Sequence, residues 1–387
     1  MKYYSILMTV IIAVSLLFST NTVAEEKSEE DEAFKKRVAL SKRIKQMRAI
    51  RKEMPEPPPA GLFGIYHLPE KDQFVAGINV QKFSFSGLLH GSNSVSAETV
   101  ATTAPNIFFG NPMQPPTLRV IPKSVEANVM FPFINYSISD QMSLVAIAPL
   151  IKKKLVLETF QGPMGTNSLG QNSVTSSGIG DIKFGMLYTP YKKYSDKGVR
   201  EHNLLLIAVA SAPTGSIKEE DDMLTPMNTM NRARLAYGMQ LGTGTWDALV
   251  GAAYWGKGEN WGWGAQYLAT VPLQDEGSEG WRFGDKQELT GWASYSWDPT
   301  LVNSFRIRYE NQDDIDGIDP NIYGPGLGAN PANYGGTKTE LIAGINWMYK
   351  PGRNISLEFS IPVSQDRNGH QLEQDYSLMI SWRNVFF

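Results

Sequence analysis

From Gln73 onward, hydrophobic and polar residues alternate with a period of two, in runs of about ten residues separated by Gly, Pro, Asn and Asp clusters. Successive side chains of a strand point to opposite faces, so each run predicts a strand with one apolar and one polar face. We expect twelve such strands, at 73–85, 123–137, 141–157, 178–190, 202–212, 246–256, 260–272, 285–297, 301–311, 337–349, 354–362 and 373–386.

The connections between these segments alternate in length. Short turns are expected at 139–140, 257–260, 298–299 and 350–352, and long loops at 84–122, 158–177, 213–245 and 312–336, whereas 191–201 fits neither class. Outer-membrane barrels place short turns in the periplasm and long loops outside the cell. The pattern therefore predicts an all-β fold, a transmembrane antiparallel β-barrel of about 12 strands with a periplasmic C-terminus.

Charged residues of the predicted strands share the polar face. A charge on the lipid face at mid-bilayer costs about 2 to 4 kcal/mol, so this face should line the lumen. Such charges either pair with one another across the lumen or, if unpaired, set solute selectivity. The candidates are Asp181, Lys183, Lys286, Glu288, Arg306, Arg308, Glu310, Lys338, Glu340, Glu358, Glu373 and Asp375.

Aromatic residues gather near the strand ends, as in the aromatic girdles of membrane barrels. The final strand also ends in aromatic residues, with Phe386 in the outward register. A soluble sandwich would alternate as well, but it would not place these rings at strand ends. The girdle candidates are Trp246, Tyr254, Trp261, Tyr295, Trp297, Trp347 and Tyr349.

The N-terminal region divides into three segments. Residues 1–24 have a positive start, an apolar run and a small-residue cleavage site after Ala24, which predicts a signal peptide. Residues 25–54 predict a charged periplasmic helix with a modest apolar stripe, which is either solvated or used for self-association or for docking to a periplasmic partner. Residues 55–72 form a Pro-rich linker, and the barrel should occupy 73–387.

Composition excludes several classes of function. The net charge of -3 argues against nucleic acid as a partner, and the absence of cysteine excludes thiolate chemistry. The four histidines are scattered along the chain, so a multi-histidine metal site would need long-range convergence. They are His67, His90, His202 and His370.

One acidic loop resembles a calcium-binding loop in its spacing. Asp314, Asp316 and Asp319 surround Gly317, but Pro325 stands where an EF-hand carries its closing Glu. This leaves two interpretations, a solvated loop or a weak divalent-cation site that bridges lipopolysaccharide phosphates.

Glycine motifs recur at the edges of the predicted strands. They are Pro59-Ala60-Gly61-Leu62-Phe63-Gly64, Gly178-Ile179-Gly180-Asp181-Ile182, Ala212-Pro213-Thr214-Gly215-Ser216, Gly242-Thr243-Gly244-Thr245-Trp246-Asp247 and Ile361-Pro362-Val363-Ser364-Gln365-Asp366. In combination, over about residues 57–387, they resemble the outer-membrane transporter-like family labelled meta-pathway phenol degradation. The resemblance implies a small barrel that helps hydrophobic or aromatic compounds cross the outer membrane, without a catalytic site.

The resulting hypothesis is a passive outer-membrane channel or uptake barrel for a small, hydrophobic or aromatic solute, with no cofactor and no chemical step. Its partners would be outer-membrane lipid, lipopolysaccharide and the solute. One alternative is a structural or interaction protein that uses the helix at 25–54. The other is a barrel enzyme of the phospholipase type, which would need a Ser beside a His, and His202 is the only histidine near a strand.

Overall fold

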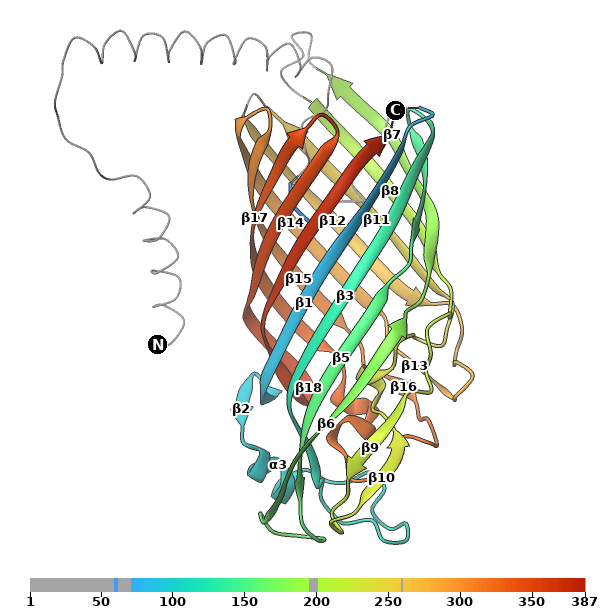
Figure 1. Ribbon diagram of the computed structural model, residues 1–387, viewed down its shortest axis with the longest axis vertical. Helices are drawn as coiled ribbons and strands as arrows, with labels where there is room; N and C mark the ends of the chain where they lie inside the picture. The colour runs from blue at the N-terminus through green and yellow to red at the C-terminus, as the bar shows by residue number, and fades with distance from the viewer. Residues whose placement is uncertain (1–58, 62–70, 195–200, 259, 387) are drawn as a thin grey trace, which may run out of the picture. The chain divides into compact units, whose positions relative to one another are not determined.

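The computed structural model describes residues 59–61, 71–194, 201–258 and 260–386, and the predicted signal peptide and helix lie outside these ranges. The described chain forms an antiparallel sheet that closes on itself through the pairing of β1 with β3 (Figure 1). In order around the ring, the strands are β1 (Phe74–Gly91), β18 (Arg353–Phe386), β17 (Gly336–Lys350), β15 (Leu301–Gln312), β14 (Lys286–Asp298), β12 (Trp261–Pro272), β11 (Asp247–Lys257), β8 (Glu201–Ser211), β7 (Lys183–Tyr194), β4 (Met142–Ile147) and β3 (Val120–Ser139).

The predicted closed antiparallel barrel is confirmed, and eleven strand elements form its ring. The predicted segments 354–362 and 373–386 belong to the single element β18. Its part up to Arg367 pairs with β17 and its part from His370 pairs with β1. Between them Gly369 has a φ of 58°, which a residue without Cβ adopts readily.

Three further strands of the same sheet lie outside the ring: β2 (Asn93–Val95), β5 (Leu150–Phe160) and β6 (Ser168–Ile179). The predicted strand 141–157 divides at residues 148–149 into β4 and β5. The prediction of a loop at 158–177 is wrong, because β6 occupies much of it. The strand is rich in small and polar residues, and Val174 is its only buried apolar side chain, so the alternation was hard to detect.

The first and last strands of the ring, β1 and β18, are neighbours. Phe74 is paired with Phe386, and their rings stack with centroids 4.5 Å apart. Both rings are about two-fifths exposed on the outer face, so Phe386 has the outward register expected from the sequence.

The two ends of the barrel differ. At the short-turn end, at the top of Figure 1, lie the tight turns between β3 and β4, between β14 and β15, and between β17 and β18. At the loop end, at the bottom, the long connections fold into a cap. The cap contains α3 (Ala97–Thr103), β9 (Glu220–Leu224), β10 (Met230–Arg234), η2 (Tyr237–Met239), β13 (Trp281–Arg282), β16 (Asp316–Gly317), η3 (Leu327–Ala329) and η4 (Pro331–Asn333).

The cap has its own hydrophobic clusters. Val100 and Ala101 of α3 pack against Ile121 and Phe160. Arg119, which is fully buried, donates hydrogen bonds to the carbonyl oxygens of Ala101, Gln161 and Gly165 at 2.9 to 3.1 Å. A buried guanidinium that joins three segments holds the loops in one arrangement.

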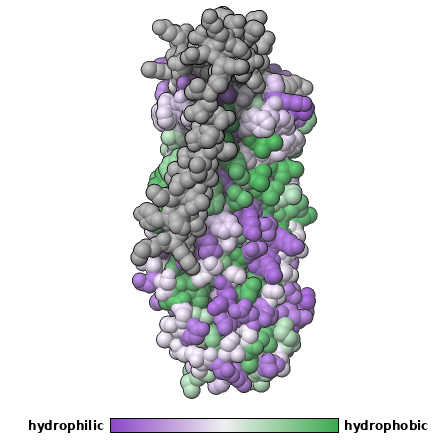
Figure 2. Space-filling view, turned by 60° about the vertical axis from the view of Figure 1, so that its left-hand side comes forward, coloured by the Kyte–Doolittle hydropathy of each residue, from purple (hydrophilic) through white to green (hydrophobic). Residues whose placement is uncertain are grey.

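The outer wall carries exposed apolar side chains on every second residue of the strands, as in β18, where Ile355, Leu357 and Phe359 are 41% to 45% exposed. Figure 2 shows hydrophobic residues gathered over the half of the visible face nearer the short turns, and hydrophilic residues more frequent toward the loop end. Exposed aromatic rings lie at the short-turn end, including Trp261, Trp297 and Trp347. Among the described residues, none of the helices has the length and apolar character needed to cross a bilayer.

Candidate functional site

Charged side chains of β14, β15, β17 and β18 form a network on the inner face of the wall, which we call the charged belt. At its centre, Arg308 pairs with Glu340, with Nε 2.9 Å from the carboxylate. Arg306 pairs with Glu358 at 2.7 Å. The belt has four cations and four anions: Lys286, Arg306, Arg308 and Lys338, with Glu288, Glu310, Glu340 and Glu358.

Uncharged polar side chains also form hydrogen bonds with the charged belt. Glu340, with no exposed surface, also accepts hydrogen bonds from Ser360 at 3.0 Å and Gln374 at 2.8 Å. Gln374 in turn accepts one from Lys338 at 2.8 Å. Every charge of the belt has an opposite charge within 4.0 Å. Four of these side chains are buried: Arg306, Lys338, Glu340 and Glu358.

Residues 59–61 lie against the belt. Pro59 and Ala60 are buried, and a Cβ on Gly61 would fall 1.9 Å from the Glu358 carboxylate. Ala60 also lies close enough to Gly344 of β17 that a Cβ there would approach it to 2.8 Å. This short segment, placed in the linker by the sequence, occupies the inside of the barrel at the level of the Arg306–Glu358 pair.

A different surface lines the other part of the ring, across β4, β7, β8, β11 and β12. Its inward side chains form one apolar cluster, which we call the apolar sector. Along β8, Leu205, Ile207 and Val209 are buried, whereas the alternate residues Leu206 and Ala208 are exposed on the outer wall. The sector consists of Val145, Leu187, Leu205, Ile207, Val209, Ala253 and Leu268, with Ile147, Leu249 and Trp255 packed against it.

Three of the glycine motifs meet where β7, β8 and β11 reach the cap. Asp181 accepts hydrogen bonds from the backbone N–H groups of Gly215 and Thr243 at 2.8 and 2.7 Å. A Cβ on Gly242 would lie 2.5 Å from the carbonyl oxygen of Gly215, so the two backbones touch. Lys183 donates to Ser211 at 2.8 Å in the same region. Asp181 therefore joins the backbone at Gly215 to the backbone at Thr243, and it is not a member of the charged belt.

The free edge of β6 is covered by the cap instead of another strand. Asp221 of β9 accepts a hydrogen bond from the backbone N–H of Thr175 at 2.8 Å, and Ser176 donates to the Met239 carbonyl oxygen at 2.7 Å.

Asp375, predicted to be a lumen charge, accepts from the hydroxyls of Ser84 and Ser86 at a bulge between β1 and β18. It too lies outside the belt.

The three acidic loop residues do not converge on a cation site. Asp314 accepts from Asn368 at 2.6 Å, Asp316 pairs with Arg282 at 3.1 Å, and the buried Asp319 pairs with Arg234 at 3.1 Å. Within the described ranges, no group of three or more His, Asp or Glu residues could hold a metal ion.

The structure brings together two histidines that the sequence left apart. His90 and His370 are directly paired across β1 and β18 at the loop end, with ring centroids 4.3 Å apart. Burial, followed by the neighbouring His90, lowers the pKa of His370. His202 lies at the opposite end, where Nδ1 is 3.1 Å from the Tyr254 hydroxyl and the ring meets Trp263 edge-on. These described contacts of His202 include no serine.

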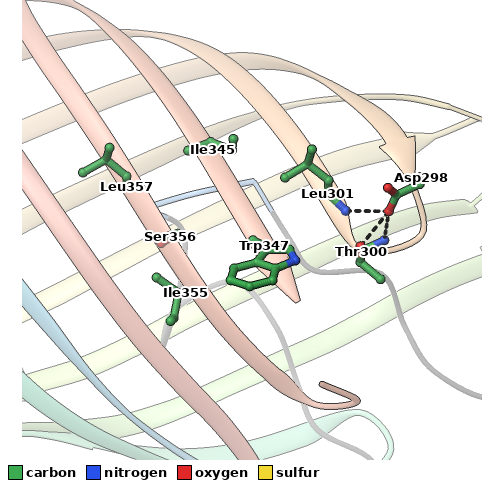
Figure 3. A pocket seen from close by; sticks show the side chains of 8 residues that line it. All are labelled: Asp298, Thr300, Leu301, Ile345, Trp347, Ile355, Ser356 and Leu357. Carbon is green, nitrogen blue, oxygen red and sulfur yellow. Dashed lines mark hydrogen bonds between the residues drawn. The ribbon is translucent and has the colours of Figure 1, made fainter. Parts of the chain in front are cut away.

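Two apolar grooves lie on the outer wall. One, of about 410 Å³, is formed at the short-turn end by outward residues of β15, β17 and β18, including Trp347, Ile345 and Leu357. Figure 3 shows Asp298 at its edge accepting hydrogen bonds from Thr300 and Leu301. The other, of about 810 Å³, spans β3, β4, β7, β8 and β11. Both grooves face the side of the wall that carries the exposed apolar residues.

The described chain is similar to solved outer-membrane barrels. With an outer-membrane channel from Pseudomonas putida F1 it shares 14% identity at a TM-score of 0.52, covering 86% of this chain and all of the other. The toluene transporter TodX of P. putida shares 13% identity at a TM-score of 0.40, over 86% of this chain and 93% of the other. The translocator domain of the autotransporter NalP from Neisseria meningitidis shares 8% at 0.39, over 92% and 98%.

At this level of identity, the first similarity shows the fold alone. The fold is that of an outer-membrane β-barrel. No protein-family model and no curated protein matches the sequence. The family label that the glycine motifs suggested is therefore not confirmed.

The sequence missed the apolar sector and the contact of residues 59–61 with the belt. Strand β8 could have indicated the apolar sector, because its burial alternates from one residue to the next. However, both faces of β8 are apolar, so polarity alone does not show which face points into the barrel. Nothing in the local sequence indicates the contact of residues 59–61 with the belt.

Proposed function

We propose that the protein is a passive outer-membrane channel for a small hydrophobic or aromatic solute, with its loop end outside the cell and its C-terminus in the periplasm. The observation that carries the proposal is the two-sided lumen, in which an apolar sector and a charged belt line different parts of one ring. The fold that it shares with an outer-membrane channel supports this proposal.

The apolar sector offers a hydrophobic solute a surface on which it need not be fully hydrated. Transfer of apolar area out of water is favourable by roughly 25 cal/mol per Å². A small aromatic ring would gain this along β4, β7, β8, β11 and β12, while a hydroxyl or carboxylate on it could turn toward the belt. A channel lined only by charges would offer no such preference.

The belt and residues 59–61 restrict the passage of ions. Arg306, Glu358 and Ala60 are buried, so little solvent-accessible surface remains at this level of the wall. We infer that solute transit requires displacement of the segment at 59–61, and that steady ion conductance is low. A chemical step is not part of the proposal, since the phospholipase alternative needs a serine beside a histidine and the described contacts of His202 include no serine.

The test compares solutes and variants. Uptake of radiolabelled toluene and of a polar solute of similar size would be measured in cells that produce the wild type, Val145→Thr/Val209→Thr, or Val250→Thr. The double variant adds two hydroxyls to the apolar sector at nearly constant volume, whereas Val250 faces outward and serves as the matched control. We expect toluene uptake to fall several-fold in the double variant only, with little change for the polar solute.

Equal uptake by the wild type and the double variant, at equal levels of folded protein, would contradict the proposed solute class. Planar-bilayer recordings of the folded protein give a second measurement. Large, stable conductance steps in the wild type would contradict the closed state, and a shift of ion preference in Arg306→Ala would then favour an open, charge-selective pore.

A further inference from the structure

The outer wall changes from apolar to basic within one row of residues across β1, β3, β5 and β6. Residues paired directly in an antiparallel sheet lie on the same face, so the register defines rows that run across the wall. One outward row consists of exposed apolar side chains, 39% to 55% exposed. From β18 to β6 these are Ile380, Val80, Met130, Leu150 and Ile179.

The next two outward rows, toward the loop end, are polar on these four strands. The first consists of Lys82, Asn128, Lys152 and Ser177, and the second of Ser84, Glu126, Lys154 and Thr175. Strands are spaced about 4.8 Å apart, so Lys82 and Lys152 lie about 10 Å from each other along their row. We call the lysines and their polar neighbours in these rows the basic rim.

The charges of the basic rim are not balanced. Lys82 pairs with Glu126 at 3.4 Å, which uses the one acidic residue of the two rows. Lys152 and Lys154 are exposed and have no ion-pair partner within 4.0 Å among the described residues. The carboxylates that flank the rim are Asp221, which accepts from the Thr175 backbone, and Asp375, which accepts from Ser84.

The basic rim is confined to one sector of the wall. Where the outward face of β14, β15 and β17 approaches the loop end, the paired row is Gln287, Asn311 and Thr337, which carries no cation. The outward row of β14, β15 and β17 at this level therefore lacks the lysines that β1 and β5 carry. The ammonium groups of Lys152 and Lys154 lie next to the outward apolar row, on its loop-end side. An anionic group at the same depth would neutralise their charge.

We propose that the basic rim binds lipopolysaccharide through the phosphorylated sugar headgroup of its lipid A. Lys152 and Lys154 contact phosphate, Asn128 and Ser177 hydrogen-bond the headgroup, and the acyl chains lie on the apolar row formed by residues such as Met130 and Leu150. Ammonium–phosphate contacts are charge-assisted and stronger than neutral hydrogen bonds. This proposal rests on the proposed outward orientation of the loop end, but not on the identity of the transported solute.

The experiment uses the purified full-length mature chain in detergent and titrates it with diphosphorylated lipid A, monophosphorylated lipid A and phosphatidylglycerol, with the bound lipid counted by native mass spectrometry. The test variant is Lys152→Ala/Lys154→Ala. The matched control, Lys193→Ala/Lys350→Ala, removes two exposed lysines at the short-turn end. Toluene uptake by both variants is measured in parallel.

We expect diphosphorylated lipid A to bind more tightly than the other two lipids. Its affinity should fall about tenfold or more in the test variant alone, because that variant lacks the ammonium–phosphate contacts of Lys152 and Lys154. Unchanged affinity in the test variant, an equal loss in the control, or equal binding of phosphatidylglycerol would overturn the proposal. Normal toluene uptake together with failed lipid A binding would refute the basic rim and leave the channel proposal standing.

Discussion

The buried pair Arg306–Glu358 provides a quantitative test of how the lumen is stabilised. The two side chains are only 7% and 6% exposed and meet at 2.7 Å. Removing one partner of such a pair leaves an uncompensated buried charge and typically costs about 3 to 5 kcal/mol, whereas replacing both with apolar residues of similar volume is often neutral. We therefore expect Arg306→Met to lose about 3 to 5 kcal/mol, and Arg306→Met/Glu358→Leu to lose about 1 kcal/mol or less.

The assay is urea unfolding of the barrel in phospholipid vesicles, followed by tryptophan fluorescence, with both single variants and the double variant. The control is Arg353→Met at the exposed short-turn end, which should change the free energy of unfolding by less than about 0.5 kcal/mol. The reasoning would be refuted if the effects of the two single variants simply added in the double variant, or if Arg306→Met unfolded like the wild type.

Three further predictions concern the loop end. Gly242→Ala should destabilise the protein by about 1 to 3 kcal/mol, because the added Cβ would clash with the backbone of Gly215. Gly326→Ala is the control, since nothing lies within 4 Å of the added Cβ, and its stability should be unchanged. Chemical unfolding measures the stability of both variants. Arg119→Met should leave three carbonyl oxygens without their donor, and limited proteolysis should show faster cleavage of the cap, with the barrel strands still protected. The lowered pKa of His370 means that the folded state binds fewer protons than the unfolded state just below about pH 6.5, so stability should fall as the pH drops through this range. The melting temperature of His370→Gln should fall less than that of the wild type between pH 7 and pH 5, and an equal fall would show that this histidine contributes nothing.

The strands were predictable because most of them carry a strict alternation. Along β15, Arg306 and Arg308 face inward, whereas Phe305 and Ile307 face the lipid, as the pattern indicates. The limits of prediction are also physical. Strand β6 has too few large side chains to reveal an alternation, and the fold-back inside β18 joins two segments without a gap.

The candidate site was predictable only as a set of inward charges. Which carboxylate meets which cation depends on the register between neighbouring strands, which a single sequence does not specify. Arg308 lies directly opposite Glu340 on β17, whereas Arg306 reaches across to Glu358 of β18. The pairing of His90 with His370 depends on the same long-range register. The predicted role of these charges in selectivity stays a prediction.

The stacked rings of Phe74 and Phe386 have a consequence for how the protein reaches its native state. The ladder between β1 and β18 joins residues as distant in sequence as Phe74 and Phe386, so closure has to wait until β18 has been synthesised and exported. Contacts between residues so distant in sequence are slow to form, because the entropy of the intervening loop is lost before the contact stabilises the chain. Until then β1 and β18 each present an unpaired edge, which makes the nascent barrel dependent on assistance against aggregation during its passage to the membrane.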